Sequence, residues 1–126
     1  MKEKYTFLLS GQPLASFRWG EASNRMWDTY NQQQCNHRIE LKNQFQDEPL
    51  LTSPLDISLT FHILRDSNNH INNMSIINMV RSTNSIFSGI IYKKETLVRN
   101  IKARKIYSTI PHTEIIITPL KKEDNE

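Results

Sequence analysis

The sequence has a single cysteine, Cys35, only three glycines, and no long apolar run. One cysteine excludes an intramolecular disulfide and any zinc site built from several cysteines, and we expect Cys35 to be a small buried side chain on a helix. No segment approaches the ~18 apolar residues of a membrane span. The N-terminal MKEKYTFLLSGQ has too short an apolar run for a signal peptide and lacks a small-residue cleavage site. We therefore expect an intracellular, cytoplasmic location, either in the cell that makes the protein or in a host cell into which it is delivered. We expect no membrane partner.

The length of 126 residues predicts one domain with one modest core. We assign residues 1–120 to this domain and residues 121–126 to a charged, frayed tail. The net charge of +3 is mildly basic, and the excess polarity comes from Asn, Gln, Ser and Thr rather than from charge. This composition fits a polyanionic partner, but it fits an ordinary basic domain equally well.

Hydrophobic periodicity and turn residues predict an α+β fold. Strands are expected over 4–10, 55–63, 97–108 and 113–120, and helices over 30–46 and 75–88. Residues 14–29 and 65–73 are expected to be loops, with Asp28 or Thr29 capping the first helix and Ser75 the second. Gly89 stands where the second helix should end. This order predicts two helices packed on one mixed or mainly antiparallel sheet.

Three segments also predict which side chains face the core. In LDISLTFHI, residues 55–63, apolar and polar side chains alternate strictly, so one face is buried. His62 falls on the polar face, and we interpret it as a lone solvated histidine. Each of the two helices should turn one stripe of side chains inward, which comprises Tyr30, Gln34, His37 or Arg38, Leu41 and Phe45 in the first and Ile76, Met79, Val80, Thr83, Ile86 and Phe87 in the second.

Several segments follow one another in the order of a known nuclease family. They are Gly11-Gln12-Pro13, Arg18, Arg25-Met26-Trp27-Asp28, the run SIINMVR from residue 75, SGIIY from residue 88, and a C-terminal strand pair containing Lys105, Tyr107 and Pro111. Across residues 5–120 this order resembles the RusA family of Holliday-junction resolvases, small dimeric endonucleases common in phages and prophages. The resemblance implies a RusA-like domain, a homodimer, branched DNA as partner, and a phage or mobile-element context.

The resemblance fails at the positions of the catalytic carboxylates. RusA-like enzymes hold Mg²⁺ with several acids, because Mg²⁺ is a hard cation that requires oxygen ligands. By position those acids correspond here to Ser75, Ile77, Ser85, Lys94 and Glu95, of which Glu95 alone is acidic, and residues 67–94 contain no Asp or Glu. We therefore expect no catalytic residues, no bound metal and no cofactor. A divergent Mg²⁺ nuclease with relocated carboxylates stays open as an alternative, and the scattered histidines give no ligand-like spacing for a softer metal.

Most of the basic positions in the RusA-like pattern carry Lys or Arg in this sequence as well. Residues 93–105 carry Lys or Arg at six positions against one acid, and strand geometry should place Lys102 and Arg104 on one face and Arg99 and Lys105 on the other. Phosphate contacts need no metal, so DNA binding can outlast catalysis. The candidate DNA-binding residues are Arg18, Arg25, Arg81, Lys93, Lys94, Arg99, Lys102, Arg104 and Lys105.

These observations leave three functional hypotheses. The first is a non-catalytic binder of branched DNA that acts as a homodimer, because a two-fold dimer offers matching faces to a four-way junction. The second is a protein-interaction module that uses a nuclease scaffold to bind a host or replication protein, in which case the basic residues merely solubilise an exposed hairpin. The third is the divergent Mg²⁺-dependent endonuclease.

Overall fold

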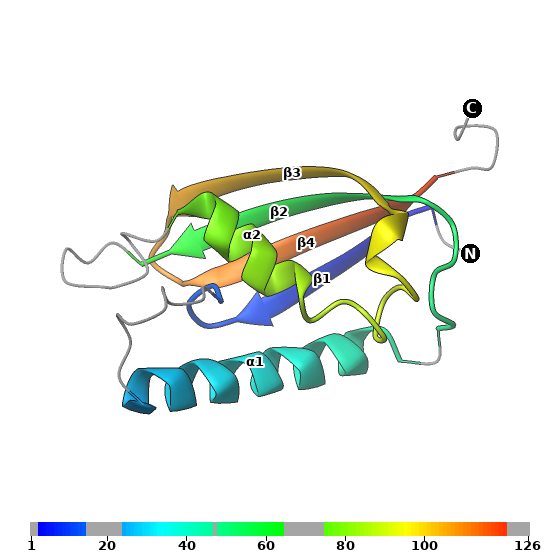
Figure 1. Ribbon diagram of the computed structural model, residues 1–126. Coiled ribbons are helices and arrows are strands. Elements are labelled where there is room, and N and C mark those ends of the chain that lie inside the picture. Colours follow the sequence, from blue (N-terminus) through cyan, green and yellow to red (C-terminus); the bar gives the residue numbers. More distant parts are fainter. Residues whose placement is uncertain (1–2, 15–23, 47, 65–74, 121–126) are drawn as a thin grey trace.

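The computed structural model describes residues 3–14, 24–46, 48–64 and 75–120, and of residues 24–28 the backbone alone. Its elements are β1 (Tyr5–Ser10), α1 (Asn24–Gln44), β2 (Leu55–Ile63), α2 (Ile76–Asn84), the short 3₁₀ helix η2 (Glu95–Leu97), β3 (Val98–Tyr107) and β4 (His112–Pro119). Two helices against one mixed sheet confirm the predicted α+β class (Figure 1). None of the helices in the described ranges is long and apolar enough to span a membrane.

Strand β2 occupies an inner position of the sheet, whose order is β1-β4-β2-β3. It pairs antiparallel with β4 on one side and parallel with β3 on the other. A parallel pair needs a crossover connection, and α2 lies within the connection from β2 to β3 (Figure 1). The predicted grouping of residues 55–63, 97–108 and 113–120 in one sheet is therefore confirmed.

The two faces of the sheet differ in polarity, as the alternation in β2 predicts. One face, the helix face, carries the buried side chains of β1, β2 and β4, onto which α1 and α2 add theirs. Phe45, which follows α1, packs edge-on against Tyr5 and Phe7 with ring centroids 5.3 and 5.8 Å apart. The other face, which we call the open face, carries the intervening residues of each strand and is not covered by either described helix (Figure 1).

Helix α1 also closes the outer edge of β1 with polar side chains. The Gln44 amide accepts a hydrogen bond from the Leu8 N–H at 2.8 Å and donates one to the Leu8 carbonyl at 2.7 Å. The Glu40 carboxylate accepts from the N–H and the hydroxyl of Ser10, and the His37 ring contacts the Ser10 carbonyl at 3.0 Å. These side chains replace the strand partner that an edge lacks, which protects β1 from pairing with another chain.

The start of α1 corrects the predicted boundary. The helix begins at Asn24 rather than near Tyr30, so residues 24–29 are not loop, and Asp28 and Thr29 lie inside the helix instead of capping it. Residues 24–29 contain no Gly or Pro, so their helix propensities allow the helix to begin at Asn24. Cys35 lies on α1 as expected, but its side chain is exposed rather than buried. The predicted loop residues 15–23 and 65–73 and the tail 121–126 lie outside the described residues.

The cap of α2 is confirmed, and its end is corrected. The Ser75 hydroxyl accepts a hydrogen bond from the Asn78 N–H at 3.2 Å, as an N-cap residue should. The helix stops at Asn84, not Ser88, because the chain turns at the C-cap residue Ser85, whose hydroxyl bonds back to the Ser82 carbonyl at 2.6 Å. Gly89, with φ of +84°, belongs to the following turn rather than to the helix end.

We expect Phe87→Ala to lower the free energy of unfolding by about 3–5 kcal/mol, because the ring is fully buried and its removal leaves a cavity. Urea denaturation measures this change. Ile77→Ala is the matched control, since the Ile77 side chain is 65% exposed and its truncation should be close to neutral. Equal effects of the two substitutions would contradict this packing.

The buried His37 should make folding sensitive to mild acid. Burial lowers the pKa of His37 below its ordinary value of 6.5. Below pH 6.5 the unfolded chain therefore binds a proton that the folded chain does not, so stability falls as the pH drops towards the folded-state pKa. This one group accounts for at most about 1.4 kcal/mol per pH unit.

His37→Gln removes this titration and keeps a side chain that can donate to the Ser10 carbonyl. We expect the wild-type free energy of unfolding, measured with urea between about pH 7.5 and pH 5.5, to fall more steeply than that of His37→Gln. Parallel curves for the two proteins would show that His37 is not held neutral by burial.

Candidate nucleic-acid interface

Helix α2 and strand β3 line a hollow of about 400 Å³ on the helix face. Ile77 and Arg81 lie four residues apart on α2 and so share one side of the helix. Ile101 and Ala103 lie two residues apart on β3 and so point to the same face of the sheet. Glu95, at the start of η2, also lines the hollow. The structure thus brings together Ile77, Arg81 and Glu95, three of the residues that the sequence singled out.

Glu95 is held in place by a chain of hydrogen bonds from the core. The Asn84 amide donates to a Glu95 carboxylate oxygen at 3.2 Å, and the Tyr92 hydroxyl donates to the Asn84 amide oxygen at 2.8 Å. Burial, assisted by the nearby Glu95 charge, raises the pKa of Tyr92 to about 12, although its hydrogen bond to Asn84 opposes the shift. Tyr92 is therefore a neutral donor at physiological pH, and Asn84 must turn its oxygen to Tyr92 and its NH₂ to Glu95.

The other positions of the expected acids serve local structure. Ser75 caps α2, and Ser85 follows its last residue and accepts a hydrogen bond from the Gln34 amide at 3.3 Å. Ile77 is exposed and apolar. Lys94 is exposed and precedes η2. Glu95 is consequently the one carboxylate among the described residues that line the hollow.

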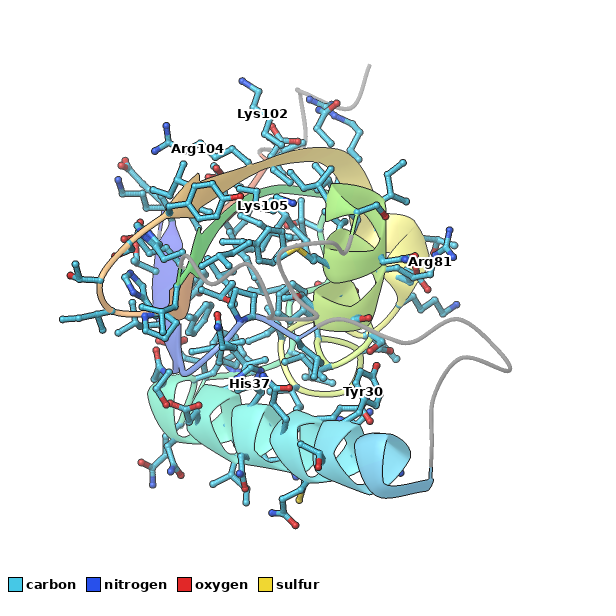
Figure 2. All side chains as sticks on the ribbon, turned by 90° about the vertical axis from the view of Figure 1, so that its left-hand side faces the viewer. Tyr30, His37, Arg81, Lys102, Arg104 and Lys105 are labelled. Carbon is cyan, nitrogen blue, oxygen red and sulfur yellow. The ribbon has the colours of Figure 1, made fainter. Side chains whose placement is uncertain are left out.

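The basic side chains divide between the two faces of β3. Lys102 and Arg104 project from the open face, where the Arg104 guanidinium donates to the Thr60 hydroxyl at 3.4 Å (Figure 2). Lys105 pairs in register with the buried Phe61, so it lies on the helix face. This separation of Lys105 from Lys102 and Arg104 confirms the predicted alternation.

The remaining candidate DNA-binding residues lie around this strand or outside the described residues. Arg81, Lys93 and Lys94 are exposed on α2 and in the segment after it (Figure 2 labels Arg81). Arg99 is exposed at a register shift between β2 and β3, and this irregularity interrupts the simple alternation that was expected of it. Arg18 and the side chain of Arg25 lie outside the described residues. The basic groups therefore surround an edge strand on two faces rather than forming one flat patch.

The structure also assembles a group that sequence reasoning missed. His62 of β2 lies directly opposite His112 of β4, with ring centroids 3.8 Å apart, and its Nε2 is 3.0 Å from a carboxylate oxygen of Glu114. The interpretation of His62 as a lone solvated histidine is wrong, because its side chain is only 14% exposed and has two partners. The contact with the His112 ring lowers the pKa of Glu114, burial opposes this shift, and the charges that His62 and His112 carry when protonated add to the lowering.

No protein-family model matches the chain, and no curated protein sequence matches it significantly.

The scarcity of carboxylates in the hollow predicts that it does not hold Mg²⁺. Glu95 is the single carboxylate among the described residues that line it, and one of its oxygens already accepts a hydrogen bond from Asn84, which leaves little negative charge for a cation that requires octahedral oxygen ligands. We expect isothermal titration calorimetry of the wild-type chain to detect no stoichiometric Mg²⁺ binding tighter than millimolar. The double variant Ser75→Asp/Ile77→Asp is the positive comparison, since it adds two carboxylates to α2 and its N-cap and should gain Mg²⁺ affinity. Stoichiometric sub-millimolar binding by the wild type would contradict the prediction.

Proposed function

We propose that this chain is a non-catalytic binding protein for branched or structured DNA, built on a RusA-like fold and active as a homodimer. The observation that carries the proposal is the arrangement around β3, where Arg81 lines a hollow with a single tethered carboxylate on one face and the exposed Lys102 and Arg104 lie on the other. The resemblance of residues 5–120 to RusA-like resolvases supplies the class of DNA. The two-fold symmetry of a four-way junction favours a two-fold dimer.

The side chains at the positions of the expected acids favour binding without cleavage. Glu95 engages Asn84 with one carboxylate oxygen, and the hydroxyls of Ser75 and Ser85 are used at the ends of α2. In-line phosphodiester cleavage by Mg²⁺ needs several negative oxygen ligands around the ion. Arg81, by contrast, lines the hollow with a charge suited to a phosphate.

The arrangement on two faces of β3 fits a branched partner better than a straight duplex. Lys102 and Arg104 point away from the face that carries Arg81 (Figure 2). A flat contact with one duplex cannot use both groups, whereas arms that diverge from a junction can pass on either side of an edge strand. Contacts to phosphate carry no sequence information, so the recognition proposed is of shape and charge.

The salt dependence of junction binding tests the proposal. We expect the affinity for a four-way junction to fall steeply with salt, and Arg81→Gln and Lys94→Gln each to reduce the log–log slope by roughly 0.9, the value for one lost phosphate contact. Fluorescence anisotropy over a series of salt concentrations measures the slope. Lys42→Gln, in the last turn of α1, is the matched control with the same change of charge and should leave the slope unaltered.

Further outcomes of the same assay decide the proposal. The charge reversals Arg81→Glu and Lys94→Glu should weaken junction binding, and Ser75→Asp/Ile77→Asp should not strengthen it or produce cleavage. If the wild type binds junction, duplex and single strand all more weakly than ~100 µM at physiological salt, it does no better than non-specific contact. The DNA proposal then fails.

One observation favours a second candidate, a protein-binding role for the same hollow. Ile77 is 65% exposed and Ile101 is 39% exposed, and both border the hollow beside the side chains of Ile76 and Val80. Exposed apolar side chains around a concavity are typical of protein contacts. A protein partner would make Ile77→Ser disruptive to its binding, whereas DNA binding should tolerate that substitution.

A further inference from the structure

Two histidines and a glutamate from neighbouring strands meet on the open face of the sheet. The antiparallel register of β2 and β4 places His62 opposite His112, and Glu114 lies two residues along β4 on the same face. One carboxylate oxygen of Glu114 is 3.0 Å from Nε2 of His62 and 3.3 Å from Nε2 of His112. One nitrogen or oxygen atom from each of the three residues lies within 4.8 Å of the others. Both strands are inner strands of the sheet, so the backbone beneath this group is held by hydrogen bonds on both sides.

The hydrogen bonds of His112 direct a lone pair towards Glu114. Nδ1 of His112 lies 2.8 Å from the carbonyl oxygen of Ile110, and a carbonyl can only accept, so Nδ1 carries a proton. In the neutral ring Nε2 is then unprotonated, and its lone pair faces a carboxylate oxygen of Glu114. Two acceptors at this separation repel each other unless a proton or a cation lies between them. Histidines that bind metals commonly donate their other ring N–H to a carbonyl in this way.

His62 presents a similar unfilled position. Its Nε2 is buried and, although it is 3.0 Å from Glu114, it has no hydrogen bond of acceptable geometry within the described part of the chain. A buried polar atom without a hydrogen bond is uncommon and calls for an explanation such as a missing ion. A cation shared by the three side chains satisfies both imidazole nitrogens and the carboxylate at once.

We propose that His62, His112 and Glu114 form a three-ligand site for a divalent transition metal, with Zn²⁺ as the fitting ion. Two imidazole nitrogens and one carboxylate are a ligand set that suits Zn²⁺, while Mg²⁺ and Ca²⁺ prefer oxygen ligands alone. Zinc bonds of about 2.0–2.2 Å in a tetrahedron separate ligand atoms by about 3.3–3.5 Å. The distances from Glu114 to the two histidines are already close to that spacing.

Closing the site needs one small movement, and it leaves one position free. The two imidazole rings are nearly parallel, with 13° between their planes, so the in-plane lone pairs of their nitrogens lie in nearly parallel planes. They must rotate apart about χ2, a torsion that is broad for histidine, to converge on one ion. Three protein ligands leave a fourth coordination position for water or another ligand. The Glu114 side chain is 45% exposed, so an ion can reach the site from solvent.

Calorimetric titration of the full, untagged chain with Zn²⁺, after removal of metal by a chelator, tests the proposal. We expect one Zn²⁺ per chain. Glu114→Gln and His112→Gln should each weaken binding by more than about 100-fold, because loss of a ligand exceeds the 10–100-fold effect of losing a group that only orients one. Asp56→Asn is the matched control, since it removes a carboxylate from the same face of β2 outside the group, and it should leave the affinity unchanged.

Nitrogen NMR of the histidine side chains identifies the ligand atoms. We expect Zn²⁺ to shift Nε2 of His62 and His112 and to leave His37, which is buried beside β1, unaffected. Circular dichroism of each variant checks that the fold persists. If His112→Gln or a His62 variant unfolds, Glu114→Gln decides the question, because its partly exposed side chain can be changed without opening the core.

Absence of saturable Zn²⁺ binding would overturn the proposal. Binding that survives Glu114→Gln and His112→Gln unchanged would also overturn it, because the ion would then be held elsewhere in the chain. The titration contains no DNA, so its failure leaves the junction-binding proposal standing, and failure of junction binding likewise leaves the metal site to be judged on its own result.

Discussion

The pairing of β2 on both of its edges is the constraint on which the rest of this structure depends. Its apolar side chains are buried on the helix face, and a shift of one residue would turn all of them to the open face. The register is therefore fixed, and with it the positions of β3 and β4. This register sets His62 against His112 and Thr60 between Arg104 and Glu114. The parallel pairing with β3 also requires the crossover that carries α2, so the hollow with Arg81 follows from the same strand.

The two edges of the sheet differ in whether helix side chains cover the backbone groups of the edge strand. At β1 the side chains of Gln44, Glu40 and His37 bond to the strand's outer backbone groups, so this edge is closed within the chain. No comparable cover from the described helices lies along the outer edge of β3, which instead carries Lys102 and Arg104 on the open face. Lysine on an edge strand also prevents edge-to-edge aggregation. The charges on β3 therefore have a structural use even without DNA, and only measurements on individual side chains separate the two roles.

Much of the fold was predictable because it depends on local pattern. The alternation around Leu59 revealed the core face of β2, and Ser75 revealed the start of α2. The start of α1 was not predictable from periodicity, because residues 24–29 show no helical spacing of apolar residues in the sequence. The pairing of His62 with His112 was also hidden. Spacing places His112 and Glu114 on one face of a strand, but it does not say which residue of another strand lies opposite, since that is set by backbone pairing across the sheet.

The proposed metal ligands and two of the proposed DNA-binding side chains lie on the same open face, so their charges affect one another. Arg104 contacts Thr60 on β2, and Thr60 lies beside Glu114 on β4, so a proposed metal ligand and a basic side chain occupy the same row across three strands. With the site empty, the Glu114 carboxylate offsets part of the positive potential of Arg104 and Lys102. A bound divalent ion would cancel that negative charge and add positive charge close to both. If both proposals hold, Zn²⁺ should therefore strengthen DNA binding through Lys102 and Arg104 and have less effect on contacts made by Arg81, because Arg81 lies across the sheet on the helix face.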